Sequence, residues 1–224
     1  MLAINMLFFY VTAIVTGNEN NPYNFLLATV YQVYIGIFYG LFIDNITGLK
    51  FYINRGDLDW MLMKPVSSQF YISMRFINFG HFISAIFSIP VMFIVLDKYN
   101  MGISKIGLLI SILYLIIGLI DAYTLLITTT SLAIVFTSSG NVSGLILPLI
   151  SLGKYPRKMF SETISRAIII LLPAILLCNF ACEAIMGVWN NLEIIVNFVI
   201  AAFNLIIAKK VFGFACNHYK SSGS

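Results

Sequence analysis

A stripe of polar side chains lies inside an otherwise apolar run of the chain. Asp121 is followed by Thr124, Thr128 and Ser131 at three, seven and ten residues, so all four share one helix face. A carboxylate in such a run costs roughly 2.5–3.5 kcal/mol on membrane-insertion scales, so its presence needs a reason. The stripe predicts a water-accessible path or gate built from Asp121, Thr124 and Thr128. It also fits an interhelical hydrogen bond that Asp121 accepts from Asn179 or a tyrosine, or a break in the helix that brings Asp121 to water.

A second group of charged residues lies in segment 53–65, which also holds Trp, Met and Leu side chains. Gly56, Asp57 and Asp59 predict a turn and the start of a short helix, because Asp at a helix start satisfies free backbone N–H groups. The predicted apolar contact face of this helix consists of Trp60, Met61 and Met63. Such a loop can transmit force from a soluble partner into a membrane domain; the alternative is an ordinary solvated helix at the interface.

The usual signatures of catalysis and metal binding are missing from the sequence. It has no Gly-rich phosphate loop and no His-Glu-x-x-His motif, and its two histidines, His81 and His218, lie in different regions. Its three cysteines suggest neither a disulfide framework nor a zinc site. We therefore expect no catalytic, metal or cofactor-binding residue, and any ATP hydrolysis must take place on another chain.

The composition is that of a membrane protein. Of 224 residues, 60% are hydrophobic and only 10% charged, with a mean hydropathy of +0.94, whereas soluble domains carry roughly 25% charged residues. The fold class predicted is all-α, a polytopic helical membrane protein with residues 1–224 as one transmembrane domain. The net charge of +4 comes from scattered basic residues, which excludes a nucleic-acid-binding stripe.

Hydrophobic runs predict six membrane spans, at 2–17, 24–44, 76–96, 106–135, 166–187 and 193–212. Eleven Lys and Arg residues fall in loops 45–75 and 136–166 and the C-terminal tail, against two on the other side. This bias predicts cytosolic N and C termini and a cytosolic loop 45–75. The first span is short for a bilayer, so we expect the natural chain to have residues upstream of Met1.

One family shares these features. Arg55-Gly56-Asp57-Leu58-Asp59, followed by Leu62-Met63-Lys64-Pro65, resembles the "basic-Gly-x-Leu-Asp, then Leu-Leu-Arg-Pro" signature of a group of ATP-binding-cassette permeases of the type-2 exporter class. Met63 and Lys64 replace the commoner Leu and Arg. Tyr155-Pro156 with Pro173, and the ending Tyr219–Ser224, are similar to further motifs of the group. A cytosolic amphipathic segment usually precedes the first span in this group, and we expect it upstream of Met1.

The resemblance implies a six-span permease in the cytoplasmic membrane. It would pair with a second, identical or different, permease subunit and sit on a cytosolic ATPase subunit that binds ATP and Mg²⁺. The residues implied to contact that ATPase are Arg55, Gly56, Asp57, Asp59, Trp60, Met63, Lys64 and Pro65. Two rivals remain: an ion-driven secondary transporter that uses Asp121, and a structural membrane protein that transports nothing.

Overall fold

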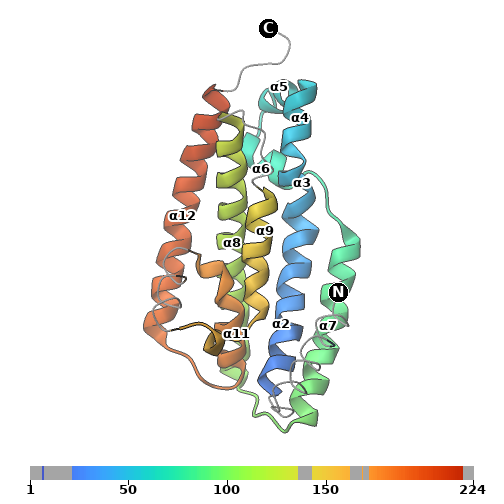
Figure 1. Cartoon of the computed structure of the whole chain (residues 1–224), viewed down its shortest axis with the longest axis vertical. Helices are drawn as coiled ribbons and strands as arrows, with labels where there is room; N and C mark the ends of the chain where they lie inside the picture. Colours follow the sequence, from blue (N-terminus) through green and yellow to red (C-terminus); the bar gives the residue numbers. More distant parts are fainter. Residues whose placement is uncertain (1–6, 8–21, 136–142, 162–167, 169–171, 219–224) are drawn as a thin grey trace.

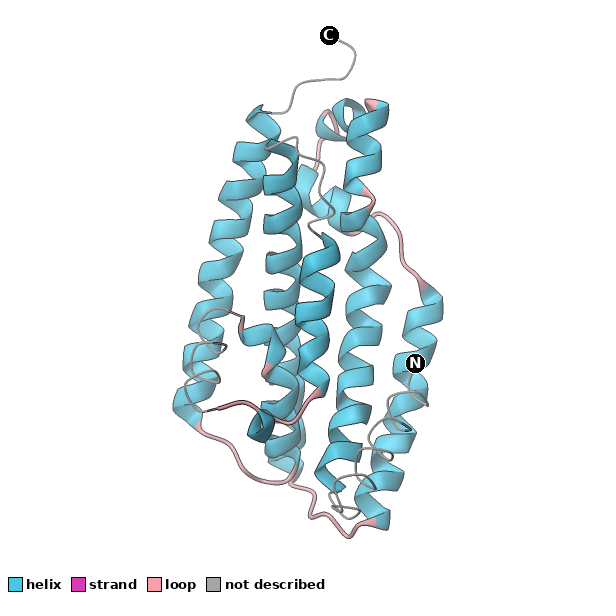
Figure 2. Ribbon diagram, viewed as in Figure 1, coloured by secondary structure: helices cyan, strands magenta, loops and turns pink. Residues whose placement is uncertain are grey.

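The computed structural model describes residues 7, 22–135, 143–161, 168 and 172–218, and the regular elements among them are all helical (Figures 1 and 2). In chain order they are α2 (Pro22–Phe38), the π-helical turn η1 (Tyr39–Ile43), α3 (Asp44–Thr47), α4 (Leu49–Arg55), α5 (Asp57–Leu62), α6 (Ser68–Ser73), α7 (Phe79–Lys98), α8 (Lys105–Val135), α9 (Ser143–Ser151), the 3-10 turns η2 (Leu152–Lys154), η3 (Arg157–Met159) and η4 (Pro173–Ile175), α11 (Leu177–Ile185) and α12 (Asn191–His218).

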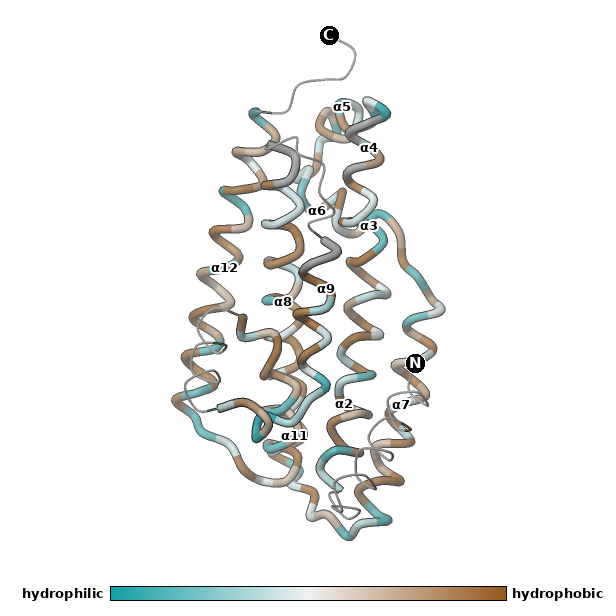
Figure 3. Tube along the Cα trace, in the orientation of Figure 1, coloured by the Kyte–Doolittle hydropathy of each residue, from teal (hydrophilic) through white to brown (hydrophobic). Residues whose placement is uncertain are grey.

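Four of the described helices are long and apolar enough to cross a membrane, as Figure 3 shows by their hydropathy. They are the continuous run Pro22–Thr47, α7, Lys105–Leu132 within α8, and α12. Pro22–Thr47 has 26 residues and reaches about 39 Å, more than the roughly 30 Å hydrocarbon core. The chain is therefore a polytopic helical membrane protein. These four helices overlap the predicted spans 24–44, 76–96, 106–135 and 193–212.

Helix α2 lies at the centre of the bundle, with α7 on one side and α8 and α11 on the other (Figure 1). In the run Pro22–Thr47, 72% of the apolar 18-residue stretch is buried inside the protein. The corresponding share in α12 is 17%. Close packing on α7 depends on two glycines. A Cβ atom on Gly36 would lie 2.8 Å from the Cβ of Ala85, and one on Gly40 would lie 2.6 Å from the ring of Phe82. This Gly-x-x-x-Gly face therefore serves packing within the chain.

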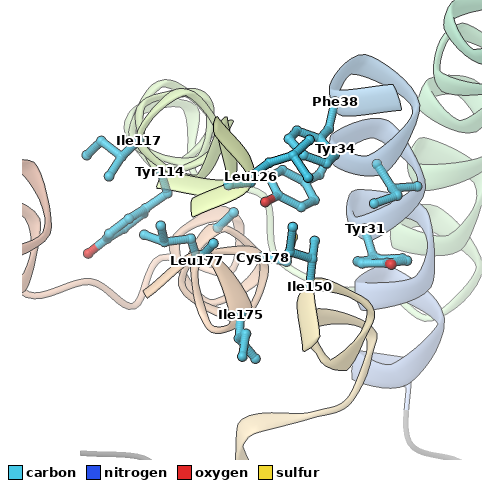
Figure 4. Packing of buried hydrophobic residues seen from close by; sticks show 14 of the residues in the cluster. Tyr31, Tyr34, Phe38, Tyr114, Ile117, Leu126, Ile150, Ile175, Leu177 and Cys178 are labelled. Atoms are coloured by element: carbon cyan, nitrogen blue, oxygen red, sulfur yellow. The ribbon is translucent and has the colours of Figure 1, made fainter. Parts of the chain in front are cut away.

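The core fills the space between α2, α8 and α11 (Figure 4). Tyr34 and Phe38 of α2 stack with ring centroids 6.4 Å apart and lie beside Leu126 of α8 in Figure 4. The buried Tyr34 hydroxyl donates to the carbonyl oxygen of Gly118 at 3.2 Å. One polar group thus joins two spans inside an apolar core.

The structure differs from the prediction for loop 136–166. Helix α9 runs beside α8 toward the lower end of the bundle in Figure 1, and η2 and η3 follow there, toward the ends at which α2 and α8 begin. Lys154, Arg157 and Lys158 therefore lie away from α4–α6, not with them. A pattern of hydrophobic runs cannot show this, because Tyr155 and Arg157 are held by Asn179 of α11.

This placement removes the charge bias from which the orientation was predicted. Toward the α4–α6 end the described residues include Lys50, Arg55, Lys64, Arg75, Lys209 and Lys210. Toward the other end they include Lys98, Lys105, Lys154, Arg157 and Lys158. Six basic residues against five do not fix an orientation, so the cytosolic placement of the termini remains a prediction.

Two predicted spans fall partly or largely outside the described residues. Of span 2–17 only Leu7 is described. Of span 166–187 the described part consists of Ile168 and residues 172–187, which include η4 and α11. Helix α11 has nine residues and reaches only about 13 Å. It packs beside the start of α8, where the amide of Ser104 donates to the carbonyl oxygen of Ile185 at 3.0 Å.

Candidate functional site

The short helix predicted after Gly56 is present as α5, at the upper end of the bundle in Figure 1. Gly56 has φ 75° and ψ 4°, a left-handed conformation that breaks α4 from α5 and that glycine adopts without steric cost. Gly56 is also the N-cap residue, so neither aspartate occupies that position. Asp57 and Asp59 lie in the first turn instead, where a negative charge is favoured by the helix dipole.

Helix α5 has one face packed on the protein and one face open. Leu58 and Met61 are each 1% exposed, whereas Trp60 is 49% and Met63 75% exposed. The predicted contact face of Trp60, Met61 and Met63 is therefore wrong for Met61, which anchors the helix from below. Trp60 and Met63 remain as apolar side chains on the open face, and Pro65 beyond them is exposed too.

The exposed Trp60 is held in place by its neighbours. The ammonium of Lys64 lies 3.8 Å from the centroid of the Trp60 ring. The ring of Tyr71 on α6 is edge-on to the Trp60 ring, with the two centroids 6.5 Å apart. The guanidinium of Arg55 lies 4.1 Å from the centroid of Phe51 in the same way. A large apolar side chain fixed in this manner loses little conformational freedom when a partner covers it.

Partly buried hydrogen bonds join the α4–α6 segment to the membrane helices. The side chain of Asn45 on α3, 2% exposed, donates to the carbonyl oxygen of Phe76 at 2.7 Å and accepts from the amide of Phe76 at 2.9 Å. On α6, Gln69 donates to the hydroxyl of Tyr123 on α8 at 2.8 Å, and the Ser73 hydroxyl lies 3.1 Å from the same oxygen. A displacement of α5 and α6 would therefore be passed to α8 and to the end of Pro22–Thr47.

Sequence reasoning missed this connection. Neither Asn45 nor Tyr123 was among the residues that the sequence singled out. A buried Asn near a predicted helix end was the available signal, because a buried amide needs partners.

Asp121 lies in the contact between α8 and α12. Its side chain is fully buried, and its Oδ1 accepts from Nδ2 of Asn204 at 3.0 Å. The Oδ2 atom has no hydrogen-bond partner among the described residues. The predicted partner, Asn179 or a tyrosine, is wrong: Asn204 of α12 takes that place, 83 residues along the chain.

The hydroxyls of the predicted stripe bond mainly to their own helix. Thr124 Oγ1 donates to the carbonyl oxygen of Asp121 at 2.9 Å, and Ser131 Oγ donates to that of Ile127 at 2.6 Å. Asp121 and Thr124 are buried, whereas Thr128 is half-buried. The structure thus brings the three candidates to one helix face as predicted, but a role for them as a path remains a prediction.

A third polar group is Asn179, fully buried on α11. Its Oδ1 accepts from the Tyr23 hydroxyl at 2.9 Å and from the amide of Arg157 at 2.8 Å, and its Nδ2 donates to the carbonyl oxygen of Tyr155 at 3.1 Å. The side chain therefore ties the Tyr155-Pro156 turn to α11 and to the start of α2. This network is structural, because each of its polar atoms is satisfied within the chain.

No group of His, Cys, Asp and Glu in the described residues could hold a metal ion. Neither the curated proteins nor the solved structures that were compared with the chain give a match. Among protein families, the one described as "ABC-2 family transporter protein" matches residues 1–223. The chain therefore belongs to the ABC-2 family of transporter proteins and is a membrane permease component of an ATP-binding-cassette transporter.

Proposed function

We propose that this permease component exports its substrate by coupling to ATP hydrolysis on a separate cytosolic ATPase subunit, with helix α5 as the docking element. ATP and Mg²⁺ would bind to the ATPase and not to this chain. A second permease subunit, identical or different, would complete the transporter in the cytoplasmic membrane. The α4–α6 end and both termini would then face the cytosol.

The observation that carries the proposal is the two-sided burial of α5. Leu58 and Met61 fix the helix on the bundle, and Trp60 and Met63 present apolar surface outward at the end of the molecule. Exposed large apolar side chains are common on α7 and α12, where lipid can cover them. Helix α5 lies past the end of the Pro22–Thr47 run, level with the upper ends of α8 and α12 (Figure 1). At the end of the bundle, another protein is the occupant that fits Trp60 and Met63.

The hydrogen bonds below α5 support a mechanical role. A partner that closes on ATP and pushes α5 would move α6, and through Gln69 and Ser73 it would move Tyr123 on α8. Asn45 would pass the same motion to α3 and so to the central helix run. Two spans would thereby respond together to one contact.

The test is co-purification of the ATPase with the permease and its ATP turnover in the reconstituted pair. Trp60→Ala should weaken the association by about 2 kcal/mol or more, roughly thirtyfold, because interface energy concentrates in buried aromatic anchors. Trp189→Ala is the matched control, since Trp189 precedes α12 at the opposite end of the bundle. Full association and full ATP turnover of Trp60→Ala would exclude α5 as the docking element.

One observation favours a second candidate, the ion-driven transporter. Asp121 is a buried acid with an unpartnered oxygen, and such groups in membrane helices often bind protons or cations. Asp121→Asn distinguishes the two candidates, because the amide can still accept from Asn204 but cannot carry a charge. Transport by this variant should persist in an ATP-driven exporter and should stop in an ion-driven transporter.

A further inference from the structure

An open groove with apolar walls lies between α6 and α12. It has a volume of about 440 Å³, and its walls come from η1, α6, α8 and α12. Figure 1 shows α6 beneath α4 and α5, and α12 as the outer helix on the left. The large apolar side chains that line the groove are Phe42, Phe70, Met74, Leu205 and Ile206.

The polar groups in the wall of the groove are bonded mainly to one another. Gln69 Nε2 donates to the Tyr123 hydroxyl oxygen at 2.8 Å, and the Ser73 hydroxyl donates to the carbonyl oxygen of Gln69 at 2.7 Å. Among the described lining residues only Ser67 and Lys209 add further polar groups, and both are exposed. The hollow therefore suits an apolar chain, because a polar molecule would lose its hydration there for few new hydrogen bonds.

The groove lies at one edge of the hydrocarbon core of the membrane. Along α12 no Asp, Glu, Lys or Arg occurs between Glu193 and Lys209. These two residues are about 24 Å apart along the helix, close to the roughly 30 Å of the hydrocarbon core. Lys209 is thus at the level of the lipid headgroups, and Ile206 lies one turn inside. On the other wall, Met74 comes directly before Arg75, the last charged residue before α7 begins.

A bilayer lipid is the occupant that matches both the walls and the depth. A hollow left empty beside the lipid would lose dispersion contacts on its open side, and acyl chains are the apolar groups available at that depth. Lys209 is exposed, and none of the described lining residues is acidic. Basic residues at the membrane surface attract acidic lipids. We propose that the groove holds one acyl chain of an anionic phospholipid from the leaflet at the α5 end, with its phosphate at Lys209.

This lipid would lie directly below the segment that docks the ATPase. Helix α6 forms one wall of the groove and carries Gln69 and Ser73, which contact Tyr123 on α8. An acyl chain between α6 and α12 would fill the space beside this contact and support α6 in its place. Lipid binding itself needs no ATPase, so it can be tested on the permease chain alone.

The experiment is photolabelling of the purified full chain in phosphatidylcholine nanodiscs. Two probe lipids carry a diazirine in one acyl chain and differ only in their headgroups, phosphatidylglycerol and phosphatidylcholine. Mass spectrometry of peptides then locates the label. The phosphatidylglycerol probe should label the α6 peptide about fivefold more than the phosphatidylcholine probe, the preference expected from one lysine at the membrane surface.

A bulky side chain tests whether the label comes from the groove. Ile206→Trp should fill the hollow and reduce labelling of α6 severalfold, because the acyl chain loses its space. Val199→Trp is the matched control, since Val199 lies two turns earlier on the same face of α12 and is 58% exposed, against 55% for Ile206. It should leave the α6 label unchanged. Equal α6 labelling in both variants would overturn the proposal.

A pair of adjacent lysines tests the headgroup contact. Lys209→Gln should remove the preference for phosphatidylglycerol, whereas Lys209→Arg should keep it. Lys210→Gln is the control, because Lys210 is exposed but is not among the lining residues, and it should keep the preference as well. A native chain without the preference, or a preference that survives Lys209→Gln, would contradict an anionic lipid at this site.

Other occupants give different products. Phe70, 63% exposed, is replaced by cysteine in a chain whose native cysteines are alanine, and the thiol carries a benzophenone. Adducts with lipid support the proposal, whereas a cross-linked pair of permease chains would show that a second copy covers the groove and would overturn it. Trp60→Ala should lose the ATPase and keep the lipid label, so this proposal and the proposed function fail separately.

Discussion

Trp60 on α5 and Asp121 on α8 both lie where their residue types are uncommon. Large apolar side chains are usually buried and carboxylates are usually exposed, and here the reverse holds. The indole is half exposed at the end of the bundle, whereas the carboxyl is fully buried between two membrane helices. Trp60 is fixed by Lys64 and Tyr71 but remains 49% exposed. Asp121 has one bond to Asn204 and one oxygen without a partner.

The comparison shows how each placement can be used. An apolar side chain held rigidly in water is stabilised further only when another surface covers it, so Trp60 favours binding to a protein. A polar side chain in a helix contact is stabilised by its partner within the chain, so Asp121 favours the fixed packing of α8 on α12. Helix α5 thus exposes apolar side chains at the surface, where a partner can cover them. The Asp121–Asn204 pair buries its polar atoms between two helices of the same chain.

Loss of the support beneath α5 should have the largest effect. Leu58→Ala removes a side chain that is 1% exposed, and such core truncations cost about 2–5 kcal/mol. The α4–α6 segment should therefore open locally and become sensitive to limited proteolysis between α4 and α6, while the spans remain protected. Phe51→Ala, at a residue 52% exposed, is the control. Equal protease resistance of both variants would mean that α5 is not held by its buried face.

Breaking the Asp121 pair should have the next largest effect. Asn204→Leu leaves the buried carboxyl without its donor, at a cost of about 2–3 kcal/mol. The Tm of the chain in detergent should fall, whereas Asp121→Asn should change it little, because the Asn204 bond can be kept. If Asn204→Leu leaves the Tm unchanged, then the carboxyl finds another partner and is not fixed by α12.

The smallest effect should come from the cation above Trp60. Lys64→Gln removes the ammonium that lies 3.8 Å from the ring centroid, worth about 0.5–1 kcal/mol at an exposed site. The affinity of the ATPase for the permease should fall about two- to fivefold. Titration of the reconstituted pair measures this affinity. Lys64→Arg should restore it, since arginine also stacks on aromatic rings. A loss as large as that of Trp60→Ala would show that Lys64 itself contacts the ATPase.

Local sequence features predicted the parts of the molecule that depend on nearby residues. The four long helices follow from apolar runs of bilayer length, and α5 follows from Gly56 and two acidic residues ahead of an apolar stretch. Its inward and outward faces did not follow from the sequence. Met61 is buried because α6 and α8 lie beneath α4 and α5, and the position of those helices is a tertiary property.

The parts that could not be predicted depend on contacts between distant residues. Asn204 and Asp121 are 83 residues apart, and Tyr23 and Asn179 are 156 apart. Loop 136–166 was predicted on the side of α5 because hydropathy separates runs without showing which way they fold. The bonds of Asn179 to Tyr155 and Arg157 draw that turn toward the opposite end, and with it the basic residues on which the orientation had been based.

Site-directed cross-linking tests the docking of α5 most directly. Met63→Cys and Val188→Cys each place a single thiol in a chain whose native cysteines are replaced by alanine. The native side chains are 75% and 63% exposed, and they lie at opposite ends of the bundle. A maleimide–succinimide reagent would then be added to the assembled transporter. The account predicts that Met63→Cys captures the ATPase and Val188→Cys does not. Capture through Val188→Cys, or through neither position in a complex that hydrolyses ATP, would contradict it.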